Sequence, residues 1–543
     1  MSGIPDELQP LLDPESSVPA TIEPNRSTSK LQDGHVVLAP SDARSIELET
    51  IPETATVGRN LSWTSAYMLT ISRVVGSGIF ATPGNIYKTV GSVGLTLTIW
   101  IVGATVAACG MAISLELGCM LPRSGGHKVY LEFMYRRPRF LASTLVAVQA
   151  VVLGFSASNC IVFGEYMLAA FDIEATAFRQ RTLAVGLLTV VTVIHGCFLK
   201  TGIWIQNALA WVKLGLMAFM AILGVVALFL PHTSSRANAQ ALSVPRLFEG
   251  SNWELVALST AFFKVVYSFA GYDNVNNVLN EVKDPVRTLK TMAPTALLTV
   301  AVFYLMINIA YFIVVPLDEI KNSGELIAAL FFEKIFGASV GSTILPILVA
   351  VSGAGNVMVV TFALSRLNQE IARQGFLPFP KYLASSYPFG APLGGLMVHY
   401  IPSILVITLP PQQDVYAFIL DVEGYPGQFF IMAISLGTLW LRRSRPDLKR
   451  PFKAWKAAIW LRIALSACMM VAPFVPPKNG RGDVGFWYAT YAVVGGGILI
   501  FGVLYWYIWT ILIPRLRGYH LEEETDLLED GTSVTKLVKI KNE

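Results

Sequence analysis

Two short stretches rich in glycine and small residues interrupt otherwise apolar segments of the chain. They are Val75-Gly76-Ser77-Gly78-Ile79-Phe80-Ala81-Thr82-Pro83 and Tyr267-Ser268-Phe269-Ala270-Gly271-Tyr272-Asp273-Asn274. Glycine weakens a helix interior, and proline is well placed only in a helix's first turn. We therefore expect both helices to unwind at these stretches, and the first to restart near Pro83. A single glycine in such a helix would instead be explained by close helix packing.

Unwound backbone inside an apolar segment can bind a small zwitterion. Freed N–H groups and the positive end of a half-helix suit a carboxylate, while freed carbonyls suit an ammonium group. We predict that the substrate site uses these breaks, with the following residues: Ser77, Gly78, Ile79, Tyr267, Ser268, Phe269 and Gly271. No nucleophile–base pair, metal-ligand cluster or Walker motif stands out, so we expect no enzyme, no cofactor and no metal.

Lys213 lies in the apolar run from Trp211 to Met217, too far from either end to extend its amine to water. Burial disfavours the charged form of an amine, so this lysine could exchange a proton at cytoplasmic pH. Two interpretations remain open. Lys213 either couples transport to protons, or it is a permanently charged structural residue held by backbone carbonyls.

Other polar residues in the apolar segments have less certain roles. Candidates for lining a side-chain pocket are Ser156, Asn159, Ser352, Asn356, Asp421 and Glu423, although hydroxyls also serve helix packing. Asp273 and Asn274 are predicted to cap the restarted half-helix rather than to contact a ligand. His195 is predicted to be structural, and the sequence does not decide the role of Lys264.

Two ionisable residues, Glu116 and Arg366, lie near the ends of apolar segments. Either their side chains extend toward water or they form an ion pair at an inner gate. Glu165 is expected at the outer membrane interface.

The composition explains where these residues must lie. The chain has 543 residues, of which 53% are hydrophobic and 14% charged, with a mean hydropathy of +0.54. Soluble domains carry roughly 25% charged residues, which excludes an ordinary cytosolic protein. The formal net charge of +4 gives no reason to expect a nucleic-acid partner.

Apolar runs bounded by charged, proline or glycine clusters predict twelve spanning helices. Their expected ranges are Trp63–Tyr87, Val93–Met120, Leu141–Phe171, Thr182–Leu199, Ile203–Leu230, Leu255–Leu279, Met292–Val315, Ile344–Ile371, Leu393–Leu409, Val415–Leu441, Ala457–Val475 and Val484–Ile513. The chain is thus predicted to be an all-α membrane protein surrounded by lipid. Breaks in spans one and six fit two inverted repeats of five helices plus two extra helices.

The loops predict the orientation and the domain boundaries. Loops on the side of the termini hold about twice the basic residues of the opposite loops, so both termini are predicted to be cytoplasmic. The run from Arg442 to Pro446 is interpreted as a stop-transfer flank rather than a lipid-binding patch. Asp318 to Gly337 is predicted to be an external loop with a short helix.

The tails differ in composition from the apolar region. Residues 1–60 are predicted to be a disordered cytoplasmic tail, 61–514 the transporter domain and 515–543 a cytoplasmic tail. Glu7 to Leu12 is similar to an acidic dileucine sorting signal, and Lys30 is a candidate site for ubiquitin, so the tails could engage ubiquitin or endocytic machinery. All five cysteines lie in apolar runs, where no disulfide framework is expected.

Several motifs resemble the amino acid/polyamine/cation superfamily, particularly its L-type amino acid transporter branch and fungal permeases within it. They are Gly76 to Pro83, Glu116-Leu117-Gly118, Leu121 to Gly126, Ser365-Arg366-Leu367, Gly375 to Pro378 and Leu441 to Pro451. The resemblance covers about Trp63 to Ile513. It implies the LeuT-type fold, broken helices one and six, and amino acid uptake, with Tyr267 matching an aromatic residue that gates the bound substrate.

The resemblance also implies partners and substrate. Lys213 matches a lysine whose ammonium occupies the sodium position of sodium-coupled relatives. The aromatic pair Tyr267 and Phe269 favours an apolar or thioether side chain. Proton-coupled import of a neutral amino acid, with methionine as the specific expectation, is therefore predicted at the plasma membrane, with the vacuolar membrane as an alternative.

Two other functions remain open, an amino acid exchanger and a nutrient receptor with little flux. Animal relatives of this branch carry a cysteine after the third helix for a disulfide to a heavy chain. Phe171 to Arg181 has none, so no such disulfide partner is expected.

Overall fold

The computed structural model describes most of the apolar region of the chain. The described residues are 31–32, 35–36, 61–122, 125–154, 156–229, 243–337, 343–385, 389–409, 415–476, 487, 489–527 and 533–541. The sorting motif from Glu7 to Leu12 and Lys30 lie outside these residues.

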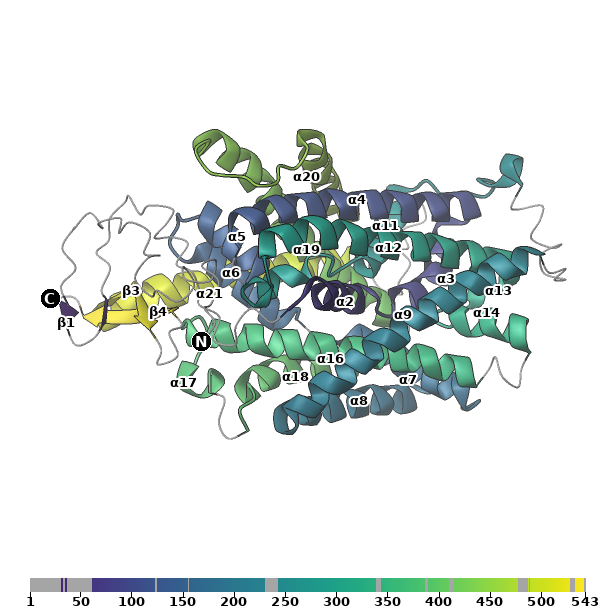
Figure 1. The fold of residues 1–543 in the computed structure, drawn as a ribbon, viewed down its shortest axis with the longest axis horizontal. Coiled ribbons are helices and arrows are strands. Elements are labelled where there is room, and N and C mark those ends of the chain that lie inside the picture. Colours follow the sequence, from purple (N-terminus) through teal and green to yellow (C-terminus); the bar gives the residue numbers. More distant parts are fainter. Residues whose placement is uncertain are drawn as a thin grey trace, which may run out of the picture.

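Long helices lie side by side along the longest axis of the molecule (Figure 1). Those that match predicted spans are α4 (Val93–Met120), α8 (Ala177–Cys197), α9 (Leu199–Phe229), α12 (Pro285–Val314), α16 (Ile344–Arg373), α18 (Leu393–Thr408), α19 (Val415–Ser444) and α20 (Lys456–Val471). Of the described residues, eight helical stretches are long and apolar enough to cross a membrane by length and composition. Two shorter apolar helices are Leu255–Ser268 and Leu393–Thr408.

The predicted breaks in the first and sixth spans are confirmed. The first span consists of α2 (Trp63–Val74) and α3 (Gly78–Val90). The sixth consists of α11 (Leu255–Ser268) and a 3₁₀ helix, η3 (Asn274–Glu281). Gly271, between them, has a φ of 98°, which residues with a β-carbon rarely adopt.

The restart of the first span differs from the prediction. The second half-helix begins at Gly78, and Pro83 lies inside it rather than at its start. Proline has no N–H, so it leaves the carbonyl of Ile79 without its helical donor. The Tyr311 hydroxyl of α12 donates to that carbonyl at 3.3 Å, which lets the helix continue through the proline.

The third predicted span is also interrupted, which the sequence analysis missed. It consists of α6 (Leu141–Val152) and α7 (Ala157–Ala170). No proline marks this interruption, and a single glycine, Gly154, was insufficient to predict it.

Short elements lie at the ends of the long helices. They are α5 (Gly126–Met134), η2 (Val244–Arg246), α13 (Leu317–Asn322), α14 (Ile327–Phe336), α17 (Pro380–Leu383) and η4 (Ala472–Phe474). The predicted external loop thus contains two short helices, α13 and α14, rather than one. The last predicted span contains α21 (Thr490–Trp506), a π-helix, η5 (Tyr507–Leu512), and α22 (Ile513–Arg517).

The region between the predicted tails is helical, as expected, and a small antiparallel sheet lies in the tails. It contains β1 (Leu31–Gln32), β2 (His35–Val36), β3 (Tyr519–Leu527) and β4 (Ser533–Lys541), in that order. The β3–β4 hairpin lies at the end of the molecule opposite α13 and α14 (Figure 1). The two predicted tails therefore pair with each other, through Val36 and Thr525.

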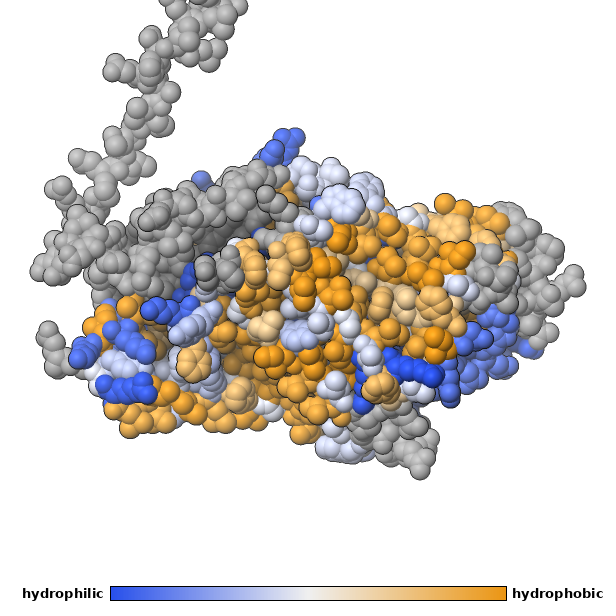
Figure 2. Space-filling model, turned by 90° about the horizontal axis from the view of Figure 1, so that it is seen from below, coloured by the Kyte–Doolittle hydropathy of each residue, from blue (hydrophilic) through white to orange (hydrophobic). Residues whose placement is uncertain are grey.

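The outer side of the helix bundle is apolar. Large hydrophobic side chains such as Trp204, Ile222 and Leu298 are more than half exposed. Figure 2 shows hydrophobic residues over much of the middle of one side and hydrophilic residues gathered toward its ends. This surface suits contact with lipid, which agrees with a multi-span membrane protein.

Candidate functional site

The two broken helices touch at their breaks. A β-carbon added to Gly78 would lie 2.5 Å from Ser268 Oγ and 2.8 Å from Ser268 Cα. Thr82 Oγ1 lies 3.3 Å from Ser268 Oγ and also donates to the Gly78 carbonyl at 2.7 Å. Glycine at position 78 is thus required for the close approach of α3 to α11.

Tyr267 joins three spans beside this contact. Its hydroxyl lies 3.2 Å from Ser77 Oγ, 2.9 Å from Ser158 Oγ and 3.1 Å from Asn159 Nδ2. The Asn159 side chain also accepts a hydrogen bond from the Ser77 N–H at 2.9 Å. The structure therefore brings the predicted residues Ser77, Asn159 and Tyr267 together, and adds Ser158.

The carbonyls at the end of α2 already have donors. Lys213 Nζ donates to Ser72 O at 2.9 Å and to Val75 O at 3.0 Å. Asn356 Nδ2 donates to Arg73 O at 3.2 Å and to Val75 O at 3.4 Å. These carbonyls at the end of α2 therefore accept from donors of the protein itself.

Lys213 is fully buried and links three helices. It extends from α9 to the end of α2, and a β-carbon on Gly355 of α16 would lie 3.1 Å from its Cε. These contacts are those of a lysine held by backbone carbonyls. They do not separate the structural interpretation from the proton-coupling one, because both place the amine at this position.

Three tyrosines that the sequence analysis missed stabilise the breaks. Tyr304 of α12 donates to Val74 O at 3.2 Å and to Ser268 O at 3.0 Å, so one hydroxyl joins both breaks. Tyr311, one heptad further along α12, holds Ile79 O, and Tyr166 of α7 donates to Phe80 O at 2.7 Å. The spacing of Tyr304, Asn308 and Tyr311 on one helix face was the signal that could have identified the pair on α12.

The first residues of α3 are suited to bind an anion. Gly78 and Ile79 have no preceding helical carbonyl in α3 to which their N–H groups could bond. Together with the positive end of the helix, such N–H groups attract a carboxylate. Gly78 and Ile79 therefore lie where a carboxylate could bind, whereas the Ser77 N–H donates to the Asn159 side chain.

Several predicted site residues make contacts away from Tyr267. The Phe269 ring packs on Trp100 and Tyr304, with centroid distances of 6.0 and 5.2 Å, so it is part of the core rather than a partner of Tyr267. Gly271 lies against Arg73, and a β-carbon there would be 2.5 Å from Arg73 Cγ. Ser156 contacts His399 instead of the breaks.

Two further predictions concern Asp273 and His195. Asp273 does not cap η3 with its side chain but forms an ion pair with His127 Nε2 at 2.7 Å. His127 comes from α5, a neighbour that the sequence did not reveal. His195 contacts the Met358 carbonyl at 3.1 Å, as expected of a structural residue.

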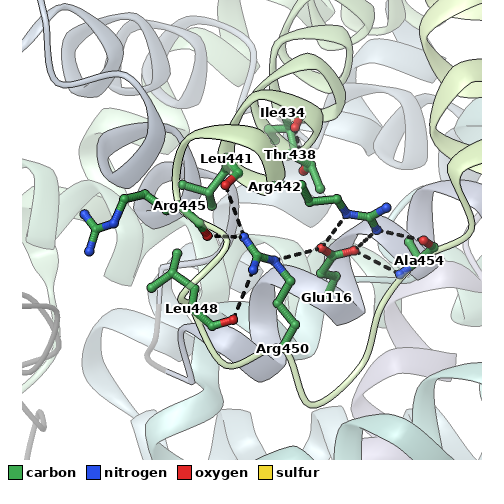
Figure 3. A network of polar contacts seen from close by, with 9 residues as sticks. All are labelled: Glu116, Ile434, Thr438, Leu441, Arg442, Arg445, Leu448, Arg450 and Ala454. Atoms are coloured by element: carbon green, nitrogen blue, oxygen red, sulfur yellow. Dashed lines mark hydrogen bonds and ion pairs between the residues drawn. The ribbon is translucent and has the colours of Figure 1, made fainter.

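Glu116 forms a charged cluster away from the breaks (Figure 3). Its Oε1 accepts from Arg442 Nε at 2.9 Å and lies 3.5 Å from Arg450 Nε, and its Oε2 accepts from the Ala454 N–H at 2.9 Å. Arg450 also donates to the carbonyls of Leu441, Arg445 and Leu448. Arg442 is therefore not a simple stop-transfer flank, since its guanidinium joins the end of α19 to α4.

Comparisons with known proteins place the chain among amino acid transporters. A family model described as amino acid permease matches residues 61–499. The chain is 35% identical to the high-affinity methionine permease of Saccharomyces cerevisiae over 490 residues, which cover 89% of this chain and 84% of that protein. It is 32% identical to the low-affinity methionine permease of the same yeast, over 92% of this chain and 91% of that protein. It is also 30% identical to the human cystine/glutamate transporter, over 70% of this chain and 74% of that protein.

Proposed function

The chain belongs to the amino acid permease family, and from this premise we propose that it is a secondary transporter that imports a neutral amino acid by proton symport. The observation that carries the proposal is the contact of two broken helices at Gly78 and Ser268, beside the Tyr267 hydroxyl. Broken helices that meet inside the membrane are the usual substrate sites of secondary transporters.

The substrate is proposed to bind in one orientation. Its carboxylate lies on the N–H groups of Gly78 and Ile79 at the start of α3. Its ammonium lies against carbonyls of the break after α11 other than Ser268 O, because Ser268 O and the carbonyls at the end of α2 accept from donors of the protein. The substrate thus connects the first broken helix to the sixth.

Methionine is the proposed substrate. Two similar proteins from yeast are named methionine permeases, at 35% and 32% identity. The groups that hydrogen-bond to the Tyr267 hydroxyl are two hydroxyls and one amide, all of them neutral. Since the Phe269 ring packs into the core, Tyr267 is the aromatic residue left to contact a thioether.

Proton coupling is proposed to use Lys213. The protonated amine holds the end of α2 against α9 and stabilises one conformation. Loss of the proton weakens both carbonyl contacts and lets α2 move. Deprotonation on the cytoplasmic side completes the cycle, and no sodium is needed.

The proposed architecture follows from the same family premise. Twelve spans form two inverted repeats of five helices plus two, with both termini in the cytoplasm of a plasma-membrane protein. Support for this comes from breaks at corresponding positions, in the first and sixth spans, and from the distribution of basic loops. Alternating access then arises as the bundle with the broken helices rocks against the remaining helices.

Uptake into proteoliposomes tests the proposal. Radiolabelled methionine is added to empty vesicles with an inside-alkaline pH gradient, without sodium, and in competition with other amino acids. The expected result is accumulation above equilibrium that collapses when the gradient is dissipated. Uptake only with preloaded amino acid would instead identify an exchanger, and binding without uptake a receptor. Stronger competition by arginine or glutamate than by methionine would refute the substrate assignment.

A further inference from the structure

The break between α6 and α7 lies directly before the residues that hold Tyr267. The α6 helix ends at Val152, α7 begins at Ala157, and Ser158 and Asn159 are the next two residues. Backbone groups freed by a break inside a membrane protein must find partners, since lipid offers none. The positions of these partners therefore set the position of the first turn of α7.

Two residues one turn apart on α18 supply those partners. His399 Nδ1 lies 2.7 Å from the Gly154 carbonyl, and Ser403 Oγ accepts from the Ser156 N–H at 3.4 Å. Ser403 Oγ in turn donates to the His399 carbonyl at 2.8 Å. His399, Ser403 and Ser156 are completely buried. The break is therefore bonded on both sides by a single helix.

The hydrogen bonds also determine the tautomer of His399. A carbonyl only accepts, so Nδ1 carries the proton and donates to Gly154 O. Nε2 lies 3.2 Å from both Ser156 Oγ and Thr361 Oγ1, two hydroxyls that can donate to it. The ring is thus neutral with both nitrogens in use, and it joins α7 to α16 as well as to α18.

We propose that His399 and Ser403 are positioning residues for the substrate site, acting through the break in the third span. By fixing Gly154 and Ser156 they set the position of Ser158 and Asn159, which hold the Tyr267 hydroxyl and the Ser77 N–H. Because His399 and Ser403 bond to the break itself, at Gly154 and Ser156, their effect on the substrate is indirect. This proposal rests on the proposed function in one respect, because the experiment that tests it measures substrate affinity.

Substitutions at position 399 separate the two nitrogens. His399→Asn keeps an amide N–H in the place of Nδ1, whereas His399→Gln places its amide near Nε2 and leaves Gly154 O without a donor. Ser403→Ala removes the acceptor of the Ser156 N–H. His195→Ala is the matched control, because His195 is another buried histidine bonded to a carbonyl, Met358 O, of a continuous helix. Each variant is measured in proteoliposomes for KM and maximal uptake, and in detergent for thermal stability.

The expected result is a KM for methionine raised about tenfold by His399→Gln and about threefold by Ser403→Ala, with maximal uptake per folded protein kept. His399→Asn should restore KM to near the wild-type value, and His195→Ala should lower thermal stability without changing KM. Equal KM values in the Asn and Gln variants, or wild-type KM in all of them, would overturn the positioning role. Absence of uptake by the wild-type protein would instead refute the proposed function, and the two failures are thus distinguishable.

Discussion

The break between α2 and α3 and the Glu116 cluster both bury polar groups, but they satisfy them differently. At the break, one lysine and two neutral side chains, Lys213, Asn356 and Tyr304, each donate to two backbone carbonyls. At the Glu116 cluster, two guanidiniums and a backbone N–H surround one carboxylate (Figure 3). Both carboxylate oxygens are occupied there, whereas α3 still presents its first N–H groups at the break.

We infer from this difference that the Glu116 cluster is structural and that the break belongs to the proposed substrate site. A carboxylate enclosed by two cations keeps helices α4 and α19 together, and leaves Glu116 with no oxygen free for a ligand. The break has filled acceptors and available donors, which is the arrangement that a ligand with a carboxylate can complete. Substitutions at the Glu116 cluster should therefore change the free energy of unfolding, and substitutions at the break should change transport.

The largest effect is expected from Glu116→Gln. Removing the carboxylate leaves two guanidiniums with a neutral amide partner, which should lower the free energy of unfolding by about 3–5 kcal/mol. Thermal unfolding in detergent measures this loss, with Arg445→Ala as the control, because Arg445 pairs with Asp447 at an exposed site. A raised KM for methionine with unchanged thermal stability would instead show that Glu116 acts in transport, and would contradict the distinction between the two regions.

Lys213→Ala should abolish concentrative uptake while substrate still binds. Wild-type uptake is expected to rise as external pH falls, and in the variant this pH dependence should disappear. Lys213→Arg sharpens the test, because arginine stays protonated. A structural lysine tolerates arginine, whereas a proton-coupling lysine does not. Normal pH dependence in Lys213→Ala would exclude Lys213 as the coupling residue.

Gly78→Ala should raise KM by about tenfold or more, because the new methyl group meets the Ser268 backbone and separates the two breaks. The contact with Ser268 also means that larger residues such as valine act on the helix contact as well as on the ligand. Gly215→Ala in α9 is the matched control, since a β-carbon there has no neighbour within 4 Å. Unchanged substrate affinity in Gly78→Ala would remove the carboxylate site from this break.

The smallest effect is expected from Tyr304→Phe. The variant keeps the ring that packs on Trp100 and loses one hydroxyl shared by Val74 O and Ser268 O, which should weaken substrate binding by about 1 kcal/mol, or about fivefold. Equilibrium binding of labelled methionine measures this change. If Tyr304→Phe lowers thermal stability and leaves methionine binding unchanged, the Tyr304 hydroxyl has a structural role alone.

The sequence predicted the elements better than their contacts. The bounds of α4 were predicted correctly, and glycines marked the first and sixth breaks, because local backbone preference determines both. The break before α7 has only Gly154 as a local signal and depends on His399, which lies far away in the sequence. The donors to α2 come from three distant helices. These hydrogen bonds depend on how helices far apart in the sequence pack together, so they cannot be deduced from the amino-acid sequence of one chain.

The filled carbonyls also give α2 the mechanics of a lever. Lys213, Asn356 and Tyr304 fasten one end of this 12-residue helix, so that end serves as the pivot. At the other end, Trp63 is held to α12 by a hydrogen bond to the Thr291 hydroxyl at an exposed position. A helix of this length is about 18 Å long, so a tilt of about 20° moves the Trp63 end by about 6 Å. Any tilt about the fastened end therefore displaces the Trp63 end more than any other part of α2.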